Sequence, residues 1–543
     1  MVSTTLPKQK LLSLVGVDEK TLLDVLPDIK ASVESHDDAG ITLEITGDRP
    51  DLLSVWGVAR AVKGFLGKES GLPASDFKAS GIRITVDPAA ESIRPVLVAA
   101  VVENARLDDV TIQHVFQVQE KLDLTCGRRR KKSSIGLYDL DKLTPPFFFK
   151  NADMATSFHP LKSDRKMTVK EILTEHLTGK EYAHLVIGDE YPVLVDSKER
   201  ILSLVDIINS AECAVTGKTK RIVIDITGTD LHSCNASLNI LCHDFADAGF
   251  TVKTVEIHHP SKKLVTPDSR PEKYSLNVDH ANQLLGTNLS PKEVVRLLKK
   301  QRLDVDVGKT ALECFVPRYR ADFLHEIDLL EEVAIAYGYN ALEPKEPSVF
   351  TVGGKSAQTY RIEKARDTLS ALGFQEVMTH IFTSPSKSLR AEVADVVRIR
   401  NPVSDEYNAL RSSLLPSLLN VLSRNTHAPY PQRVFEVGEV VVKDPSQTTR
   451  TRTDVHAAFV LAHASASLSE AASLGCELSS RLKDPFVLTP LSSTRYLEGR
   501  AASILSNNIP VGQVGEIHPA VLEKNGLFVP VSAFEVRLVS GKH

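Results

Sequence analysis

Residues 317–340 read PRYRADFLHEIDLLEEVAIAYGYN, and this stretch decides how its part of the chain folds. Asp328, Glu331 and Glu332 stand at i, i+3 and i+4, so a helix with 3.6 residues per turn places their three carboxylates on one face. Asp322, just before the helix, adds a fourth. The apolar residues of the adjoining face are expected to be buried: Leu329, Leu330, Val333 and Ala334.

Two interpretations of this acidic face follow from the spacing. Four carboxylates held together repel one another unless a cation or basic side chains offset the charge. Hard carboxylate oxygens suit Mg²⁺, which typically takes one or two carboxylates and keeps several waters. Acidic helix faces are more often simply solvated, however, and spacing alone favours the solvated face.

The wording of the segment says more than its spacing. YRADFLHEIDLLEEVAIAYGYN resembles the small magnesium-associated domain of phenylalanyl-tRNA synthetase β subunits, most closely those of the archaeal and eukaryotic cytosolic branch. In that family the positions matching Asp322, Asp328, Glu331 and Glu332 are magnesium-linked acids. All four are present here with the family's spacing, so the resemblance implies a Mg²⁺ site.

Composition sets broad bounds on the protein. A chain of 543 residues with 42% hydrophobic and 25% charged residues is typical of a globular protein with about three to four domains. The formal net charge of -4 gives no overall nucleic-acid signature. Any contact with tRNA must therefore come from local basic patches.

Location and metal class are also constrained. The N-terminus lacks the apolar core of a signal peptide, and no apolar run is long enough for a membrane span, so we expect a cytoplasmic protein with no membrane partner. The six cysteines form no CxxC pair, so the sequence does not predict a zinc site. Scattered free thiols fit a reducing cytosol.

The predicted architecture is multidomain, α/β and α+β. Residues 1–85 are expected to form a small α/β domain, 90–270 an editing-type domain, 271–345 a small domain and 350–543 a final domain. The resemblance implies that the third domain is winged-helix-like and magnesium-associated. It also implies that the fourth is an antiparallel-sheet domain like that of class II synthetases.

Two further segments carry the resemblance. GDRPDLLSVWGVARAVKGFLG, residues 47–67, predicts a helix that Asp51 could cap. GRRRKKSSIGLYDLDKLTPPF, residues 127–147, begins with five basic residues, 128–132, just after a predicted helix. The basic run is either a solvated helix end or a phosphate-contacting patch, and the sequence leaves both open.

The C-terminal domain looks like a synthetase fold without its catalytic set. PQRVFEVGEVV, residues 431–441, resembles a worn second class II motif, and Gly499 and Arg500 stand where a full G-x-G-x-x-R pattern is missing. A site that activates a carboxylate with ATP needs cationic groups for the triphosphate. We therefore predict structural or interface roles for Arg411, Arg433 and Glu436. The resemblance implies an (αβ)₂ heterotetramer whose α subunit holds the ATP and phenylalanine site.

A second chemistry is suggested by residues 221–257, which read strand, polar turn, helix, strand. Polar side chains at a strand's carboxyl end are well placed to line a pocket. In the resembled family a domain at this place hydrolyses Tyr-tRNA(Phe), and the alignment implies Leu194, Ser203, Asp225 and Thr227 as pocket residues. An Asp can accept a hydrogen bond from a tyrosine hydroxyl. The competing interpretation is ordinary strand-end hydrogen bonding.

One departure from the family falls beside this pocket. The family commonly shows LSFPPIINS, whereas this chain has LSLVDIINS at residues 202–210. Val205 and Asp206 replace two prolines, which is expected to loosen the loop next to Ser203 and alter the pocket.

Three functions are compatible with the sequence. The first is a synthetase β subunit that works with an α subunit on tRNA(Phe). The second is a free-standing hydrolase of mischarged tRNA, and the third a noncatalytic tRNA-binding or assembly protein. The full set of domains favours the first, because a free editor has no need of residues 350–543.

Overall fold

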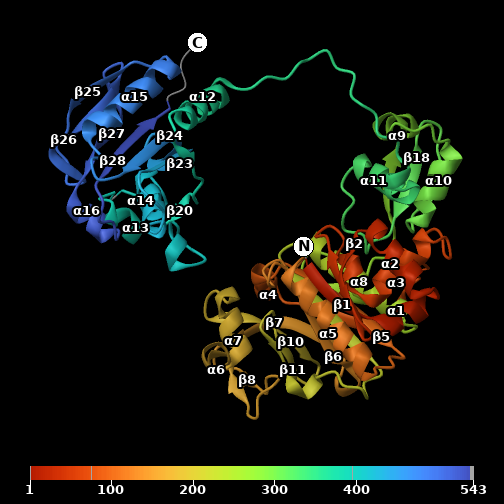
Figure 1. The fold of residues 1–543 in the computed structure, drawn as a ribbon. Helices are drawn as coiled ribbons and strands as arrows, with labels where there is room; N and C mark the ends of the chain where they lie inside the picture. The colour runs from red at the N-terminus through yellow and green to blue at the C-terminus, as the bar shows by residue number, and fades with distance from the viewer. Residues whose placement is uncertain (1, 75, 394, 539–543) are drawn as a thin grey trace. The chain divides into compact units, whose positions relative to one another are not determined.

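The computed structural model describes residues 2–74, 76–393 and 395–538, which form two compact units, residues 1–346 and 347–543 (Figure 1). Each unit is described separately below. Among the described residues, no helix is both long and apolar enough to cross a membrane.

The first unit opens with a small α/β layer. Three antiparallel strands lie in the order β1-β3-β2: β1 (Val2–Pro7), β2 (Ala31–His36) and β3 (Gly40–Ile45). Three helices accompany them: α1 (Lys8–Val15), α2 (Glu19–Val25) and α3 (Val55–Phe65). The predicted helix is α3, but its N-cap is Ser54, whose hydroxyl accepts from the Gly57 amide at 2.8 Å. Asp51 is instead buried in an ion pair with Arg49.

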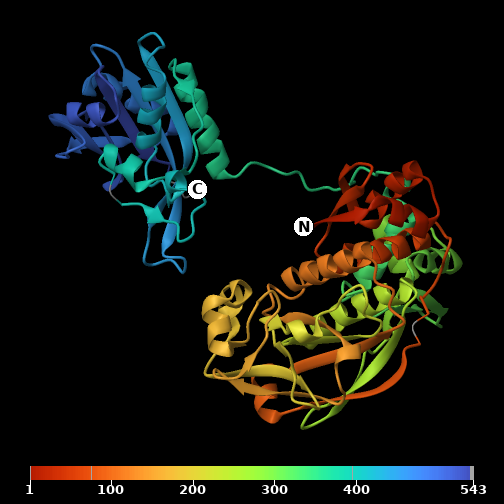
Figure 2. The ribbon, with the colours of Figure 1, turned by 90° about the horizontal axis from the view of Figure 1, so that it is seen from below.

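A ten-stranded sheet dominates the unit, with helices α5 (Asp109–Leu124) and α8 (Leu231–Asp247) packed on it (Figure 2). Its main path runs β12-β11-β10-β7-β4-β14-β5-β13-β6, and β15 (Lys263–Thr266) pairs with β14. The remaining strands are β4 (Lys78–Val86), β5 (Val96–Glu103), β6 (Ser133–Asp139), β7 (Phe147–Asp153), β10 (Glu190–Asp196), β11 (Ile201–Leu204), β12 (Ile208–Asn209), β13 (Ile222–Gly228) and β14 (Thr251–His258).

This sheet corrects one predicted boundary. β4 pairs with β7 and β14, so residues 78–86 belong to the large sheet and not to the N-terminal domain predicted to reach residue 85. The predicted strand–helix–strand is β13-α8-β14. β5 lies between its two strands and runs antiparallel to both.

A smaller layer completes the unit. Strands β16 (Glu272–Leu276), β17 (Asp304–Val307) and β18 (Leu312–Val316) form a sheet in the order β16-β18-β17. Helices α9 (Val278–Leu285), α10 (Pro291–Lys300) and α11 (Glu326–Tyr337) accompany it. α11 is the predicted acidic helix, and its apolar face is buried as expected at Leu329, Leu330, Val333 and Ala334.

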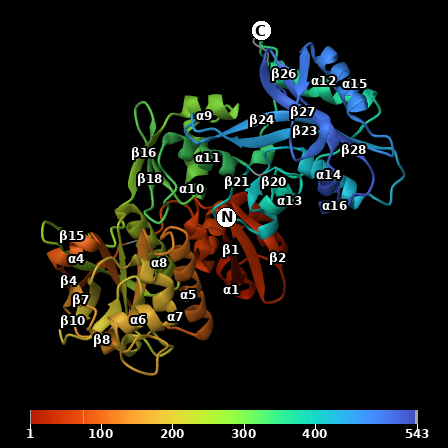
Figure 3. The same cartoon turned by 90° about the vertical axis from the view of Figure 1, so that its left-hand side faces the viewer.

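The second unit is built on a seven-stranded sheet, of which Figure 1 labels β23 to β28 and Figure 3 shows another view. Its order is β19 (Gln375–Glu376), β23 (Gln432–Lys443), β24 (Thr451–Ala462), β28 (Val531–Arg537), β27 (Ile509–Ile517), β26 (Tyr496–Ser506) and β25 (Phe486–Pro490). All neighbours are antiparallel except β19 and β23. Helices α12 (Ala357–Ala371) and α15 (Leu468–Leu482) share one hydrophobic core, and α14 (Leu415–Arg424) and α16 (Pro519–Lys524) share a second.

Candidate functional site

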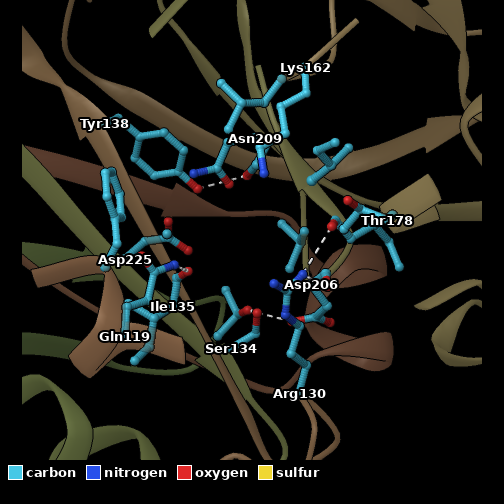
Figure 4. A pocket seen from close by; sticks show the side chains of 18 residues that line it. Gln119, Arg130, Ser134, Ile135, Tyr138, Lys162, Thr178, Asp206, Asn209 and Asp225 are labelled. Atoms are coloured by element: carbon cyan, nitrogen blue, oxygen red, sulfur yellow. Dashed lines mark hydrogen bonds between the residues drawn. The ribbon is translucent and has the colours of Figure 1, made fainter. Parts of the chain in front are cut away.

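A cavity lies where the two ends of the ten-stranded sheet meet. β6 is at one end of the strand order and β11 is near the other, yet the Tyr138 hydroxyl on β6 donates to the Ser203 hydroxyl on β11 at 2.9 Å. The sheet must therefore curl on itself. The cavity holds about 220 Å³, and Tyr138 and Asp225 lie across it from Arg130 and Asp206 (Figure 4).

Three of the four predicted pocket residues line this cavity: Ser203, Asp225 and Thr227. Leu194 does not. It lies across the β10–β11 ladder from Ser203, but it is fully buried in the hydrophobic core that also contains Tyr138. This corrects the prediction for Leu194. Its apolar side chain packs in the hydrophobic core behind the pocket wall, where it is removed from water.

Asp225 is the most unusual group in the cavity. Its Oδ1 atom is buried and has no hydrogen-bond partner among the described residues. Burial raises the pKa of Asp225 to about 7. The nearby Tyr138 hydroxyl acts to lower this pKa, and the charge of Asp206 acts to raise it. A buried acceptor left unpaired costs about 1–3 kcal/mol, and a donor that enters the pocket would remove that cost.

Gly136 keeps the space in front of Asp225 open. It lies across the β6–β13 ladder from Asp225. A Cβ atom at this position would come within 2.2 Å of Asp225 Oδ1 and 2.1 Å of Tyr138 Oη. Any side chain larger than hydrogen would therefore displace both polar groups, and the glycine is required by close approach.

The loop that was expected to be loose is tethered instead. Asp206 has a φ of 64°, a left-handed conformation that Asp tolerates better than most residues. Its Oδ1 accepts from Arg94 Nη2 at 2.7 Å and from Thr227 Oγ1 at 3.0 Å, and its Oδ2 accepts from the Tyr191 hydroxyl at 3.0 Å. Arg130 also donates to the Asp206 carbonyl at 3.0 Å. Side-chain bonds thus restrain a segment in which the resembled family uses prolines.

The basic run divides into two groups. Arg130 points inward: it lines the cavity, contacts Asp123 at 3.3 Å and stacks on the Tyr182 ring at 4.1 Å. Arg128, Arg129 and Lys131 are exposed. Arg130 therefore fits neither the solvated helix end nor the phosphate-contacting patch, while the exposed cations stay candidates for phosphate contact.

The four acids predicted to bind magnesium have protein partners. Arg320 Nη2 lies 2.6 Å from both Asp322 Oδ2 and Glu332 Oε1. Glu331 pairs with Lys30 at 2.9 Å. Asp328 Oδ2 accepts two backbone amides, those of residues 324 and 325, at 2.7 Å each.

These contacts do not fit a metal cage. Asp322 and Glu332 direct their oxygens to a buried guanidinium, and Asp328 caps its own helix. Arg320 holds the pKa of Asp322 below its ordinary value although burial acts in the opposite direction. Among the described residues, no group of three or more His, Cys, Asp or Glu side chains is arranged to hold a metal ion.

Comparison with known proteins identifies the family. Three family models match in order: "B3/4 domain" at residues 108–240, "tRNA synthetase B5 domain" at 274–339 and "Phenylalanyl tRNA synthetase beta chain CLM domain" at 342–538. A phenylalanine–tRNA ligase β subunit from Thermococcus sibiricus is 39% identical over 90% of this chain and 89% of its own length. The Archaeoglobus fulgidus β subunit is 38% identical over 99% of this chain and 98% of its own length.

The chain belongs to the phenylalanine–tRNA ligase β-subunit family. The predicted resemblance to phenylalanyl-tRNA synthetase β subunits of the archaeal and eukaryotic cytosolic branch is thereby confirmed. A crystal structure of an N-terminal fragment of the Pyrococcus horikoshii β subunit is also similar. It is 35% identical, with a TM-score of 0.61, and covers 62% of this chain and all of the fragment. Membership of this family makes the chain a ligase subunit of multidomain α/β architecture.

Two arginines of the C-terminal unit, Arg411 and Arg433, have carboxylate partners within the unit. Arg411 is buried and pairs with Glu436 at 2.9 Å, while it also donates to the Thr379 hydroxyl at 2.7 Å. Arg433 pairs with Glu470 at 3.0 Å. These contacts fit the structural roles predicted for Arg411, Arg433 and Glu436.

Several residues that line the pocket or hold its wall in place were not predicted. Gly136 and Tyr138 stand within the quoted SIGLYDLDK run, where alternate residues of a strand share one face, and that spacing was the available signal. Arg94 and Tyr191 gave no signal. Arg94 reaches Asp206 from 112 residues away in the sequence, whereas Tyr191 is 15 residues away on β10, the strand that pairs with β11.

Proposed function

We propose that this chain pairs with an α subunit as an (αβ)₂ heterotetramer that charges tRNA(Phe) with phenylalanine, using ATP, and that its own pocket hydrolyses mischarged Tyr-tRNA(Phe). The single observation that carries the editing part is the unpartnered, buried Oδ1 of Asp225. ATP and phenylalanine are assigned to the α subunit, since the class II-like C-terminal unit commits Arg411 and Arg433 to internal carboxylates.

The pocket offers what a phenol requires. A tyrosine hydroxyl must donate one hydrogen bond and accept others. Asp225 Oδ1 is a free acceptor, and Ser203, whose oxygen already accepts from Tyr138, can turn its own proton toward the cavity. Phenylalanine would satisfy neither group. A site built to bind a substrate hydroxyl can reject the analogue that lacks it by about 10⁴–10⁵-fold.

The cavity size agrees with an aminoacyl group as ligand. Its 220 Å³ is smaller than the roughly 300–1,000 Å³ of pockets for drug-sized molecules. The 18 described residues that line the cavity include no histidine, and so no Ser–His–Asp set. Hydrolysis would therefore depend on positioning the ester and a water molecule, not on a covalent intermediate. The exposed cations Arg128, Arg129 and Lys131 would attract the phosphates of the tRNA end.

Magnesium and location complete the proposal. Mg²⁺ would enter with the phosphates of ATP, which it normally accompanies. The α11 acids Glu332 and Glu331 would instead stabilise the fold through Arg320 and Lys30. A cytoplasmic location follows from the family's role in protein synthesis. A free-standing editing hydrolase is the second candidate, favoured by a pocket formed entirely within residues 1–346.

Co-expression with a candidate α subunit tests the proposal. We expect light scattering after gel filtration to give an α₂β₂ mass, and the complex to charge tRNA(Phe) and deacylate Tyr-tRNA(Phe) but not Phe-tRNA(Phe). Asp225→Asn should retain charging and lose the preference for tyrosine. A lone chain that ignores the α subunit and still deacylates Tyr-tRNA(Phe) would establish the free-standing editor.

A further inference from the structure

The Thr227 hydroxyl bonds to a carboxylate inside the wall of the pocket. Thr227 Oγ1 donates to Asp206 Oδ1 at 3.0 Å, and the Asp206 side chain has no exposed surface. Arg94 Nη2 donates to the same Oδ1 atom at 2.7 Å. Because the guanidinium has only donors, it fixes Oδ1 as an acceptor whether or not Oδ2 carries a proton. The proton of Thr227 is therefore always directed to Asp206.

This bond sets the polarity of Thr227 toward the cavity. A threonine hydroxyl has one proton and two lone pairs. With its proton committed to Asp206, Thr227 can only accept hydrogen bonds from a ligand. Ser203 has the opposite polarity, because it accepts from Tyr138 and keeps its own proton for the ligand.

The spacing along β13 matches a tyrosine. Asp225 and Thr227 are two residues apart on one strand and face the same cavity. Their α carbons are therefore separated by about 6.6 Å along the strand. That is about the distance from the α carbon of a tyrosine to its hydroxyl. With the phenol at Asp225, the α-amino end of the aminoacyl group lies beside Thr227.

We infer that Asp206 is a positioning residue that makes Thr227 an acceptor for the α-ammonium group of the aminoacyl ester, so that the pocket selects esters with a free amino group. The inference rests on the proposed editing function, since it concerns the other end of the same ligand. It also explains why an aspartate is tolerated in this loop: its carboxylate orients the Thr227 hydroxyl, which a proline could not do.

Two non-hydrolysable ligands separate recognition from catalysis: 3′-tyrosylamido-adenosine and its counterpart lacking the α-amino group. Calorimetry on the αβ complex should show that the wild type binds the amino ligand about 10–100-fold more tightly, the range of one hydrogen bond to a charged group. Thr227→Val should abolish this preference. Thr227→Ser, which keeps the hydroxyl, should retain it.

Variants behind the wall test the role of Asp206. The double variant Asp206→Ala, Arg94→Met removes the ion pair without leaving a buried charge, and should lose the preference for the amino ligand. Tyr191→Phe is the matched control. It removes the Tyr191 bond to Oδ2 but leaves the Thr227 contact, so the preference should persist. A purely structural role would instead weaken both ligands equally.

The outcomes distinguish this inference from the proposed function. Equal binding of the two ligands by the wild type, binding of neither, or an unchanged preference in Thr227→Val and the double variant would overturn the inference. A preference that follows these variants in a protein unable to deacylate Tyr-tRNA(Phe) would support the inference and refute editing.

Discussion

Replacing Arg320 with Met tests how the acidic helix face is neutralised. The Arg320 guanidinium is bonded at Nε and Nη2 to Asp322, at 2.8 and 2.6 Å, and at Nη2 to Glu332 at 2.6 Å. The side chains of Arg320, Asp322 and Glu332 are 2%, 7% and 1% exposed. Methionine has a similar length and no charge, so the substitution removes the cation with little change in volume.

The expected loss of stability follows from burial. Removing one partner of a buried ion pair costs about 3–5 kcal/mol, because the remaining charge is left uncompensated. Two carboxylates lose their partner here, which favours the upper end of that range, although Arg49 still lowers the pKa of Asp322 from nearby. Combining Arg320→Met with Glu332→Gln should recover part of the loss, since one stranded charge disappears.

Trp56 provides a specific probe for this measurement. It is the only tryptophan in the chain and is buried within α3, in the unit of residues 1–346. Urea unfolding followed by its fluorescence therefore reports on the unit that contains Arg320. Arg165→Met is the matched control, because the solvent-screened Arg165–Glu171 pair should contribute little to stability.

Metal removal sharpens the same experiment. If Arg320 and Lys30 supply the counter-charge, EDTA or excess Mg²⁺ should leave the wild-type unfolding midpoint unchanged. A drop with EDTA as large as that caused by Arg320→Met would show that a metal ion holds the acids together. A loss below about 1 kcal/mol in Arg320→Met would equally refute the reasoning.

Three further results are expected. Gly136→Ala should abolish deacylation of Tyr-tRNA(Phe) while aminoacylation stays normal, because the added methyl group would meet Asp225 and Tyr138 at 2.2 and 2.1 Å; normal deacylation would contradict the pocket assignment. The pKa of Asp225 is raised from 3.8 to about 7, so the folded state holds a proton that the unfolded state has lost, and stability falls as pH rises from about 4 to 7. At about 1.4 kcal/mol per pH unit, Asp225→Asn should reduce that fall by at most about 4 kcal/mol, measured by unfolding monitored through Trp56. An unchanged dependence of the unfolding free energy on pH would contradict the raised pKa. Arg411→Met should destabilise the C-terminal unit by about 3–5 kcal/mol, measured by hydrogen exchange along β23, since it strands the buried Glu436; unaltered exchange would count against a structural role.

The sequence predicted local structure well where periodicity was strong. The acidic helix, the strand–helix–strand of residues 221–257 and the helix after Ser54 all exist. Two predictions were wrong. Asp51 was expected to cap a helix but forms an ion pair with Arg49. β4 was placed in the N-terminal domain because the sequence of a single strand does not indicate which sheet it joins. Local pattern specifies an element, whereas its partners are chosen by packing.

The site shows the same division more sharply. Ser203, Asp225 and Thr227 were predicted by resemblance, but their chemistry depends on which atoms their hydrogen bonds leave free. Those bonds join β6 and β13, near one end of the strand order, to β11 and the turn after it, near the other end. The exchange of proline for Asp206 was expected to loosen the loop. Proline restrains the backbone directly, whereas Asp206 does so through Arg94, Thr227 and Tyr191, and in doing so it also orients a hydroxyl of the pocket. A substitution that looks damaging in sequence can thus preserve rigidity and add a specificity that the original residue could not provide.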